Sequence, residues 1–291
     1  MTTPTMNSRA WAMLLALALL WGGSFFFVGV AVREWPPVAI VLARVGLAAA
    51  ALWVVVAVMA LPVRRDGVAL RAHLGMGVLN NGIPFLLIVW AQGSLPSGAA
   101  SILNATTPLW GVAVAHVSGV ERASWNRAAG VAVGFLGVAW MVGADLLASP
   151  LPAVLAMLAA TFSYALAGLW GRRFRALEIP PLVASAGQTT SSTLLLLPAL
   201  FWVSAPMPGT GTILALVGLA LLSTALAYVL YFRLLALAGP VNLLLVTLVI
   251  PAFAILLGAA ALGERLGTQH LVGMGMIAAG LALIDGRLLR R

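Results

Sequence analysis

Charged residues are scarce in this chain of 291 residues, and cysteine is absent. Only 8% of the residues are charged, against roughly a quarter in an ordinary soluble domain, while 63% are hydrophobic. This composition excludes a soluble globular protein and favours one whose main solvent is the bilayer. Without cysteine, the chain can form no disulfide, no thiolate catalyst and no cysteine-ligated zinc or iron–sulfur site.

The sequence motifs of several enzyme classes are missing as well. The chain contains no HExxH, no G-x-S-x-G and no phosphate-binding G-x4-G-K. The segment at 273–278 matches the loose dinucleotide-binding pattern, but it is apolar and no strand precedes it, so we interpret it as helix packing. We therefore expect no enzymatic activity, no cofactor and no metal.

Ten apolar stretches are long enough to cross a bilayer, which takes about 20 residues in a helix. Turn-forming segments such as Pro-Met-Pro-Gly at 206–209 separate neighbouring stretches. We therefore predict an all-α polytopic membrane protein with ten transmembrane helices. The predicted spans are residues 10–32, 36–60, 71–92, 97–118, 126–143, 150–170, 180–202, 212–234, 240–262 and 267–285.

All sixteen basic residues are arginines, and their placement predicts the orientation of the chain. With the N-terminus in the cytoplasm, thirteen arginines fall on the cytoplasmic side, Arg33 and Arg265 fall outside, and Arg44 lies within a span. The positive-inside rule therefore predicts that both termini are cytoplasmic. We expect these arginines to contact the lipid bilayer and not nucleic acid, although the net charge is +9.

The chain contains an internal repeat with an offset of 143 residues, at which Glu121-Arg122 meets Glu264-Arg265. This match carries weight because the chain has only seven acidic residues. Since each unit holds five helices, an odd number, the second unit enters the membrane from the opposite side, which gives an inverted repeat. The two predicted units are residues 1–145 and 146–291.

Two prolines also match at the repeat offset. Inverted repeats are typical of secondary transporters, whose substrate site lies near the midplane where helices are interrupted. Pro108 and Pro251 fall near the middle of the fourth and ninth spans, where each removes one backbone hydrogen bond and frees a carbonyl. We predict a helix break or hinge at both, although one such proline alone could equally be a packed kink.

Polar and aromatic residues pair at the same offset near the centres of spans, for example Asn81 with Thr224. A polar group at this depth needs a partner. A substrate or water in a polar cavity can provide it, and so can hydrogen bonds between helices. The predicted substrate cavity comprises Trp21, Ser24, Asn81, Phe85, Gln92, Asn104, Tyr164, Gln188, Thr224, Tyr228 and Thr247.

Acidic residues are missing from the central parts of the spans, so no carboxylate relay for protons is expected. Arg44 lies about two turns into the second span, and His116 lies on the cytoplasmic side of the fourth. Arg44 either snorkels to the membrane surface or meets an anionic group of the substrate. Both residues are candidates for a gate.

Taken together, three features resemble a known family. They are the Trp21-Gly22 pair near the middle of the first span, the two five-helix halves, and the Pro-x12-Glu-Arg pattern in each half. These features are similar to the drug/metabolite transporter superfamily, in particular to its EamA-type branch and the bacterial aromatic and neutral amino-acid exporters. Tyr164 departs from the family pattern, in which tryptophan is common at this position in both halves.

The resemblance implies a multi-pass protein of the bacterial inner membrane that exports small molecules by alternating access. Amino acids suit the predicted residues, because amides, hydroxyls and freed carbonyls can hold the ends of a zwitterion and aromatic rings can face an ammonium group. We expect broad specificity for neutral and aromatic amino acids, without obligatory ion coupling. A multidrug or small-metabolite efflux carrier, which could be proton-coupled, is the alternative, and both a monomer and a homodimer remain open.

Overall fold

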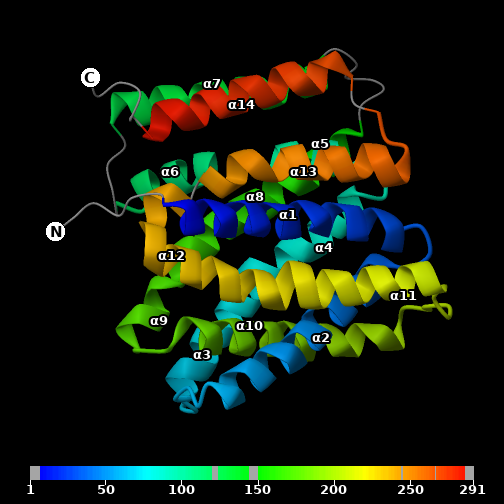
Figure 1. The fold of residues 1–291 in the computed structure, drawn as a ribbon, viewed down its shortest axis with the longest axis vertical. Coiled ribbons are helices and arrows are strands. Elements are labelled where there is room, and N and C mark those ends of the chain that lie inside the picture. Colours follow the sequence, from blue (N-terminus) through cyan, green and yellow to red (C-terminus); the bar gives the residue numbers. More distant parts are fainter. Residues whose placement is uncertain (1–6, 120–123, 144–149, 244, 266, 286–291) are drawn as a thin grey trace.

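The computed structural model describes residues 7–119, 124–143, 150–243, 245–265 and 267–285. Every regular element in these ranges is helical (Figure 1), which confirms the predicted all-α class. By length and composition, six helices or runs of adjoining helices can cross a membrane, and the last helix is a shorter apolar one. The predicted Glu121-Arg122 pair and the boundary between residues 145 and 146 lie outside the described residues.

The first half of the chain folds into α-helices with one π-helix, η1, between two of them. The elements are α1 (Ser8–Ala31), α2 (Pro37–Val58), α3 (Gly67–Met76), η1 (Gly77–Gly82), α4 (Ile83–Ala91), α5 (Ser97–Asn104), α6 (Thr107–Val117) and α7 (Trp125–Gly143). α3, η1 and α4 adjoin and form one rod. Asp66 caps its beginning, because the carboxylate accepts a hydrogen bond from the Ala69 N–H.

The second half contains a 3-10 helix, η2, and a second π-helix, η3. The elements are α8 (Leu151–Trp170), α9 (Arg172–Ala176), α10 (Pro181–Leu196), η2 (Leu197–Phe201), α11 (Thr210–Val217), η3 (Gly218–Leu226), α12 (Ala227–Leu243), α13 (Leu245–Leu262) and α14 (Thr268–Asp285). α11, η3 and α12 adjoin. α12 is kinked at Gly239, whose φ of 77° is easily adopted only without a Cβ.

The two π-helices coincide at the repeat offset, because a shift of 143 residues places η1 inside η3. A π-helix has i→i+5 bonds and one extra residue in the turn, and such segments are frequent at functional sites. η3 is mainly apolar, whereas η1 contains two glycines and two asparagines, and the sequence analysis predicted neither π-helix. The paired π-helices therefore draw attention to the middle of the third and eighth spans.

Equivalent helices of the two halves pack against each other, α2 against α10 and α7 against α14. Figure 1 shows α7 and α14 side by side along one edge of the bundle. Glycines allow this approach: a Cβ on Gly130 would lie 2.5 Å from the Gly280 carbonyl oxygen, and one on Gly137 would lie 2.8 Å from that of Gly273. The partner's number falls as the residue number rises, so the two helices are antiparallel.

The two predicted proline breaks have different outcomes. α5 ends at Asn104, α6 begins at Thr107, and Pro108 stands in the first turn of α6, so the chain is interrupted there as predicted. At Pro251, however, α13 continues without interruption, and the predicted break is wrong. A membrane helix can absorb the single hydrogen bond that a proline removes. The interruption in the second half lies upstream instead, at the kink of Gly239.

The two ends of the bundle carry different residues. We call one the arginine-rich end, because it holds Arg64, Arg65, Arg71 and the three arginines of residues 172–175. The opposite end, reached after α1, α4, α10 and α13, holds Glu34 and Glu264, and we call it the glutamate end.

Candidate functional site

Side chains from both halves form a hydrogen-bonded network in the interior of the bundle. The Asn80 amide, in η1, donates to Gln188 Oε1 of α10 at 3.1 Å and to the Tyr228 hydroxyl of α12 at 3.2 Å. The Tyr228 hydroxyl donates in turn to Asn81 Oδ1, also at 3.2 Å. With Arg44 and Thr224, these residues form what we call the polar cluster. Through Asn80, the polar cluster therefore links three residues that were predicted for the substrate cavity, namely Asn81, Gln188 and Tyr228.

Arg44 enters the polar cluster from α2. Its Nε donates to Thr224 Oγ1 at 3.0 Å, and its guanidinium carbon lies 3.6 Å from the centroid of the Phe85 ring. Thr224 is held in place because its hydroxyl donates to the Leu219 carbonyl at 2.8 Å. The Arg44 side chain is only 5% exposed, so it points into the bundle and does not snorkel to the membrane surface.

The central members of the polar cluster are shielded from bulk solvent. Asn81 is 0% exposed, Thr224 2% and Gln188 4%, whereas Asn80, Tyr164 and Tyr228 are half-buried. Asn81 Nδ2 is buried without a hydrogen-bond partner among the described residues. An unpaired buried amide donor costs about 1–3 kcal/mol, so such groups are rare and call for a functional explanation.

Gln92 belongs to a different contact, at the glutamate end. Its Nε2 donates to the Phe25 carbonyl at 2.9 Å, and the Ser97 hydroxyl donates to the same oxygen at 3.1 Å. Glu264 accepts from the backbone N–H of Ser97 at 2.9 Å and of Gly98 at 3.4 Å, which caps the beginning of α5. These bonds tie α1, α5 and the α13–α14 connection together.

Glu34 makes a second connection at this end. Its carboxylate accepts from the Thr212 hydroxyl at 2.7 Å and from the Gly209 N–H at 3.0 Å, at the beginning of α11. The Thr212 hydroxyl and then the Gly209 N–H hold the pKa of Glu34 below its ordinary value of 4.5. Trp35 Nε1 donates to the Pro206 carbonyl at 2.7 Å. The glutamate end is therefore closed by bonds between the two halves of the chain.

The other residues predicted for the site are spread over several helices. Trp21 of α1 stacks at a tilt on Tyr231, with the ring centroids 5.6 Å apart, and Ser24 is buried in the same helix. Tyr164 of α8 packs against the hydrophobic cluster that includes Phe85. Asn104 ends α5, Thr247 lies in α13, and His116 is exposed in α6.

The EamA-like transporter family matches residues 9–143 and, a second time, residues 151–285. The chain belongs to this family. Three relatives align over most of their length. YedA of Escherichia coli K12, named an uncharacterized inner membrane transporter, is 25% identical over 93% of this chain and 89% of its own. A probable terminal-alkyne amino-acid exporter of Streptantibioticus cattleyicolor is 28% identical, with 98% and 96% covered.

The third relative of this EamA-like transporter is a probable amino-acid metabolite efflux pump of Salmonella typhimurium, 26% identical over 95% of this chain and 94% of its own. A crystal structure titled "Crystal structure of protein" has a similar fold, with a TM-score of 0.70, 20% identity, and 98% and 99% of the two chains covered. The EamA-like transporter is accordingly a membrane transporter of small molecules and not an enzyme, and it is a multi-pass protein of the inner membrane.

Asn80 is the member of the polar cluster that the sequence analysis of this EamA-like transporter missed. At the repeat offset Asn80 matches Ser223, whose hydroxyl is buried in η3 without a hydrogen-bond partner among the described residues. The same signal that selected Asn81 could therefore have selected its neighbour. Both consecutive amides are bonded to the Tyr228 hydroxyl: Asn80 donates to it and Asn81 accepts from it. Both residues lie in the wide turn of the π-helix η1.

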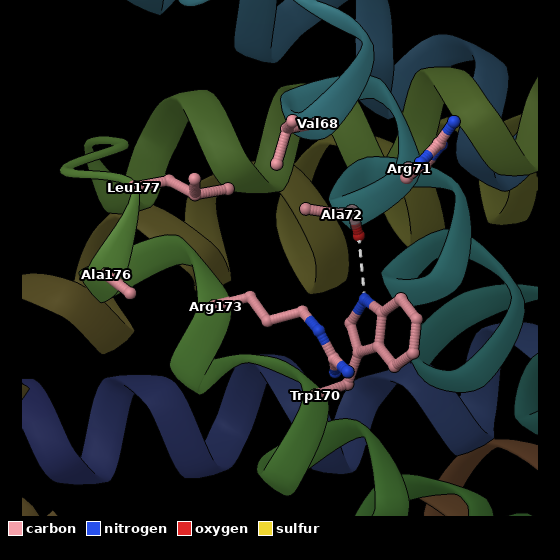
Figure 2. Close-up of a pocket in the computed structure, with 7 residues that line it drawn as sticks. All are labelled: Val68, Arg71, Ala72, Trp170, Arg173, Ala176 and Leu177. Atoms are coloured by element: carbon pink, nitrogen blue, oxygen red, sulfur yellow. Dashed lines mark hydrogen bonds between the residues drawn. The ribbon is translucent and has the colours of Figure 1, made fainter.

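A pocket of about 340 Å³ opens at the arginine-rich end of the EamA-like transporter, away from the polar cluster. Trp170 is one of the residues that line it, and Figure 2 shows the indole N–H donating a hydrogen bond to the Ala72 carbonyl, at 3.0 Å. The Arg173 guanidinium lies 3.7 Å from the centroid of the Trp170 ring, so α3, α8 and α9 are joined around the pocket.

Proposed function

We propose that this EamA-like transporter exports neutral and aromatic amino acids from the cytoplasm by alternating access. The polar cluster is the observation that carries the proposal, because it lies between the halves and combines a guanidinium, amides, a hydroxyl and aromatic rings. A cation and amide donors suit a carboxylate, while amide oxygens and ring faces suit an ammonium group. Two relatives whose names refer to amino-acid export support the same substrate class.

Ten transmembrane helices in two inverted halves, residues 1–145 and 146–291, are the proposed architecture. The matching π-helices and the antiparallel packing of α7 on α14 support it, since each relates equivalent parts of the halves. Both termini are proposed to be cytoplasmic, which places the closed glutamate end outside. The glycines of α7 are occupied by α14 within one chain, which favours a monomer as the transport unit.

Transport is proposed to follow the substrate gradient without obligatory ion coupling. The polar cluster contains no carboxylate, and the carboxylates of Glu34, Asp66 and Glu264 are bonded at the ends of helices. Proton-coupled carriers often use an intramembrane carboxylate or histidine. Specificity among side chains is expected to be broad. Trp21, Tyr164 and Thr247 are proposed as further contacts of the substrate, and the segments at Pro108 and His116 are proposed to move during transport.

Uptake of labelled phenylalanine and leucine into liposomes that hold the purified chain tests this function. We expect saturable counterflow that protein-free liposomes lack and that persists when a protonophore collapses the proton gradient. Counterflow that stops with the gradient would contradict uncoupled transport. Flux of lipophilic cations without flux of amino acids would replace the proposal by multidrug efflux.

A further inference from the structure

Arg44 is a buried charge without a balancing charge in the described part of the chain. It lies about 11 Å along α2 from the beginning of the helix, and it is 5% exposed. Its hydrogen-bond partner among the described residues is the Thr224 hydroxyl, which is neutral. Arginine keeps its charge in proteins, and a charge at this depth is costly and is usually functional.

Three carboxylates of the described residues are bonded elsewhere, and no ion pair with Arg44 is found among those residues. Glu34 binds Thr212 and the Gly209 N–H, and Glu264 binds the N–H groups at the beginning of α5. Asp66 forms the one ion pair found among the described residues, with Arg64 at the arginine-rich end. Because no described carboxylate pairs with Arg44, an anion from outside the chain can serve as its partner.

The geometry of the guanidinium leaves room for such an anion. Of its hydrogen-bond donors, only Nε is bonded to a described residue, Thr224. One flat face of the guanidinium is covered by the Phe85 ring, which restricts the orientation of the group. The two terminal nitrogens remain, and a planar fork of N–H donors matches the two oxygens of a carboxylate.

We propose that Arg44 binds the α-carboxylate of the transported amino acid, with Thr224 and Phe85 positioning the guanidinium. This inference rests on the proposed function and narrows it, because the substrate must carry a free carboxylate. Asn81 Oδ1 and Gln188 Oε1 are carbonyl oxygens with a second lone pair each, and they supply acceptors for the ammonium group. Amino-acid amides, esters, decarboxylated amines and lipophilic cations are excluded as substrates.

A ligand panel on the wild-type protein tests the inference without any mutation. Uptake of labelled phenylalanine by proteoliposomes is competed with phenylalanine, 3-phenylpropionate, phenylalaninamide and phenethylamine. We expect the first two to compete and the last two to be weaker by roughly tenfold or more, the scale of one charge-assisted contact. Equal competition by the amide and the acid would overturn the role of Arg44 but leave export standing. Absence of any amino-acid flux would defeat the proposed function itself.

Substitutions of Arg44 test whether the preference for the free carboxylate depends on this residue. Arg44→Gln is expected to raise KM for phenylalanine by roughly tenfold or more and to abolish the preference for the acid over the amide. Arg44→Lys, which keeps the charge and loses the fork, should restore part of the preference. Arg33→Gln, an exposed arginine near the end of the same helix pair, is the matched control and should behave as the wild type. An Arg44→Gln protein that elutes as folded and still prefers the acid would contradict the inference.

Discussion

Tyr228 is the single residue on which the polar cluster depends most. Its hydroxyl accepts from Asn80 and donates to Asn81, so one oxygen links the two consecutive amides of η1 to α12 of the other half. Asn80 has a second bond across the interface, to Gln188 Oε1 at 3.1 Å, whereas the Asn81 side chain is bonded to the other half only through Tyr228 among the described residues. The tyrosine thus couples the two halves at the point where a substrate would bind.

Tyr228→Phe tests this coupling with the loss of one oxygen atom. We expect a loss of about 1 kcal/mol in the free energy of unfolding, the usual net value of a hydrogen bond, and an increase in KM of roughly fivefold. Thermal unfolding in detergent and counterflow measure the two effects. Tyr231→Phe is the control, because the Tyr231 ring packs on Trp21 and keeps that contact without its hydroxyl. An identical response of both variants would mean that the Tyr228 hydroxyl has no special role.

At the scale of single helices, glycine decides how closely α7 and α14 approach. A Cβ on Gly280 would lie 2.5 Å from the Gly130 carbonyl oxygen, which is backbone and cannot move aside. Gly275, on the same helix, has nothing within 4 Å of the position of its Cβ. Gly275 and Gly280 of α14 therefore differ in what they face.

Gly280→Ala should separate the two helices and destabilise the protein by about 1–3 kcal/mol, the cost of an overpacked contact. Gly275→Ala should be neutral or stabilise by up to about 1 kcal/mol, because alanine favours the helix more than glycine does. Thermal unfolding of the two purified variants in the same detergent gives the comparison. If Gly280→Ala were as stable as Gly275→Ala, the close packing of α7 on α14 would be refuted.

The Glu34 contact with α11 predicts a dependence of stability on pH. The folded-state pKa of Glu34 is lower than 4.5, so the fold favours the charged carboxylate. This contribution is fully present above pH 4.5 and is lost as the pH falls through the lowered folded-state pKa. Glu34→Gln should therefore have a lower Tm than the wild type at pH 7, and the two curves should converge in acid. Thr212→Val should reduce this difference in Tm, whereas a difference in Tm that does not depend on pH would contradict this account.

The positions of the helices and the central residues were predictable for the same physical reason. A long apolar run in the bilayer forms a helix because a helix satisfies its own backbone hydrogen bonds. The repeat identified Asn81, Thr224 and Tyr228 because polar residues are rare near the centres of the spans. The π-helices were not predictable, since no residue pattern used in the sequence analysis distinguishes i→i+5 from i→i+4 hydrogen bonding. The direction of Arg44 was not predictable either, because its long side chain can reach the surface or the interior, and only packing decides.

For the whole molecule, the charge difference between its two ends predicts how it lies in the membrane. The natural absence of cysteine allows single cysteines to be introduced at exposed positions. Ser94 and Ser204 are exposed at the glutamate end, and Gly67 and Ser118 are exposed at the arginine-rich end. The positive-inside rule places the arginine-rich end in the cytoplasm.

A membrane-impermeant maleimide should therefore label Ser94→Cys and Ser204→Cys when it is added to the periplasmic side, and Gly67→Cys and Ser118→Cys only after the membrane has been opened. Each half contributes a reporter to the periplasmic pair, because Ser94 precedes α5 and Ser204 precedes α11. Labelling of the opposite pair would reverse the orientation but preserve the two ends. Labelling of Ser94→Cys and Ser204→Cys from different sides would place the end of α4 and the end of α10 on opposite sides of the membrane. The proposal of two inverted halves that share the polar cluster would then have to be abandoned.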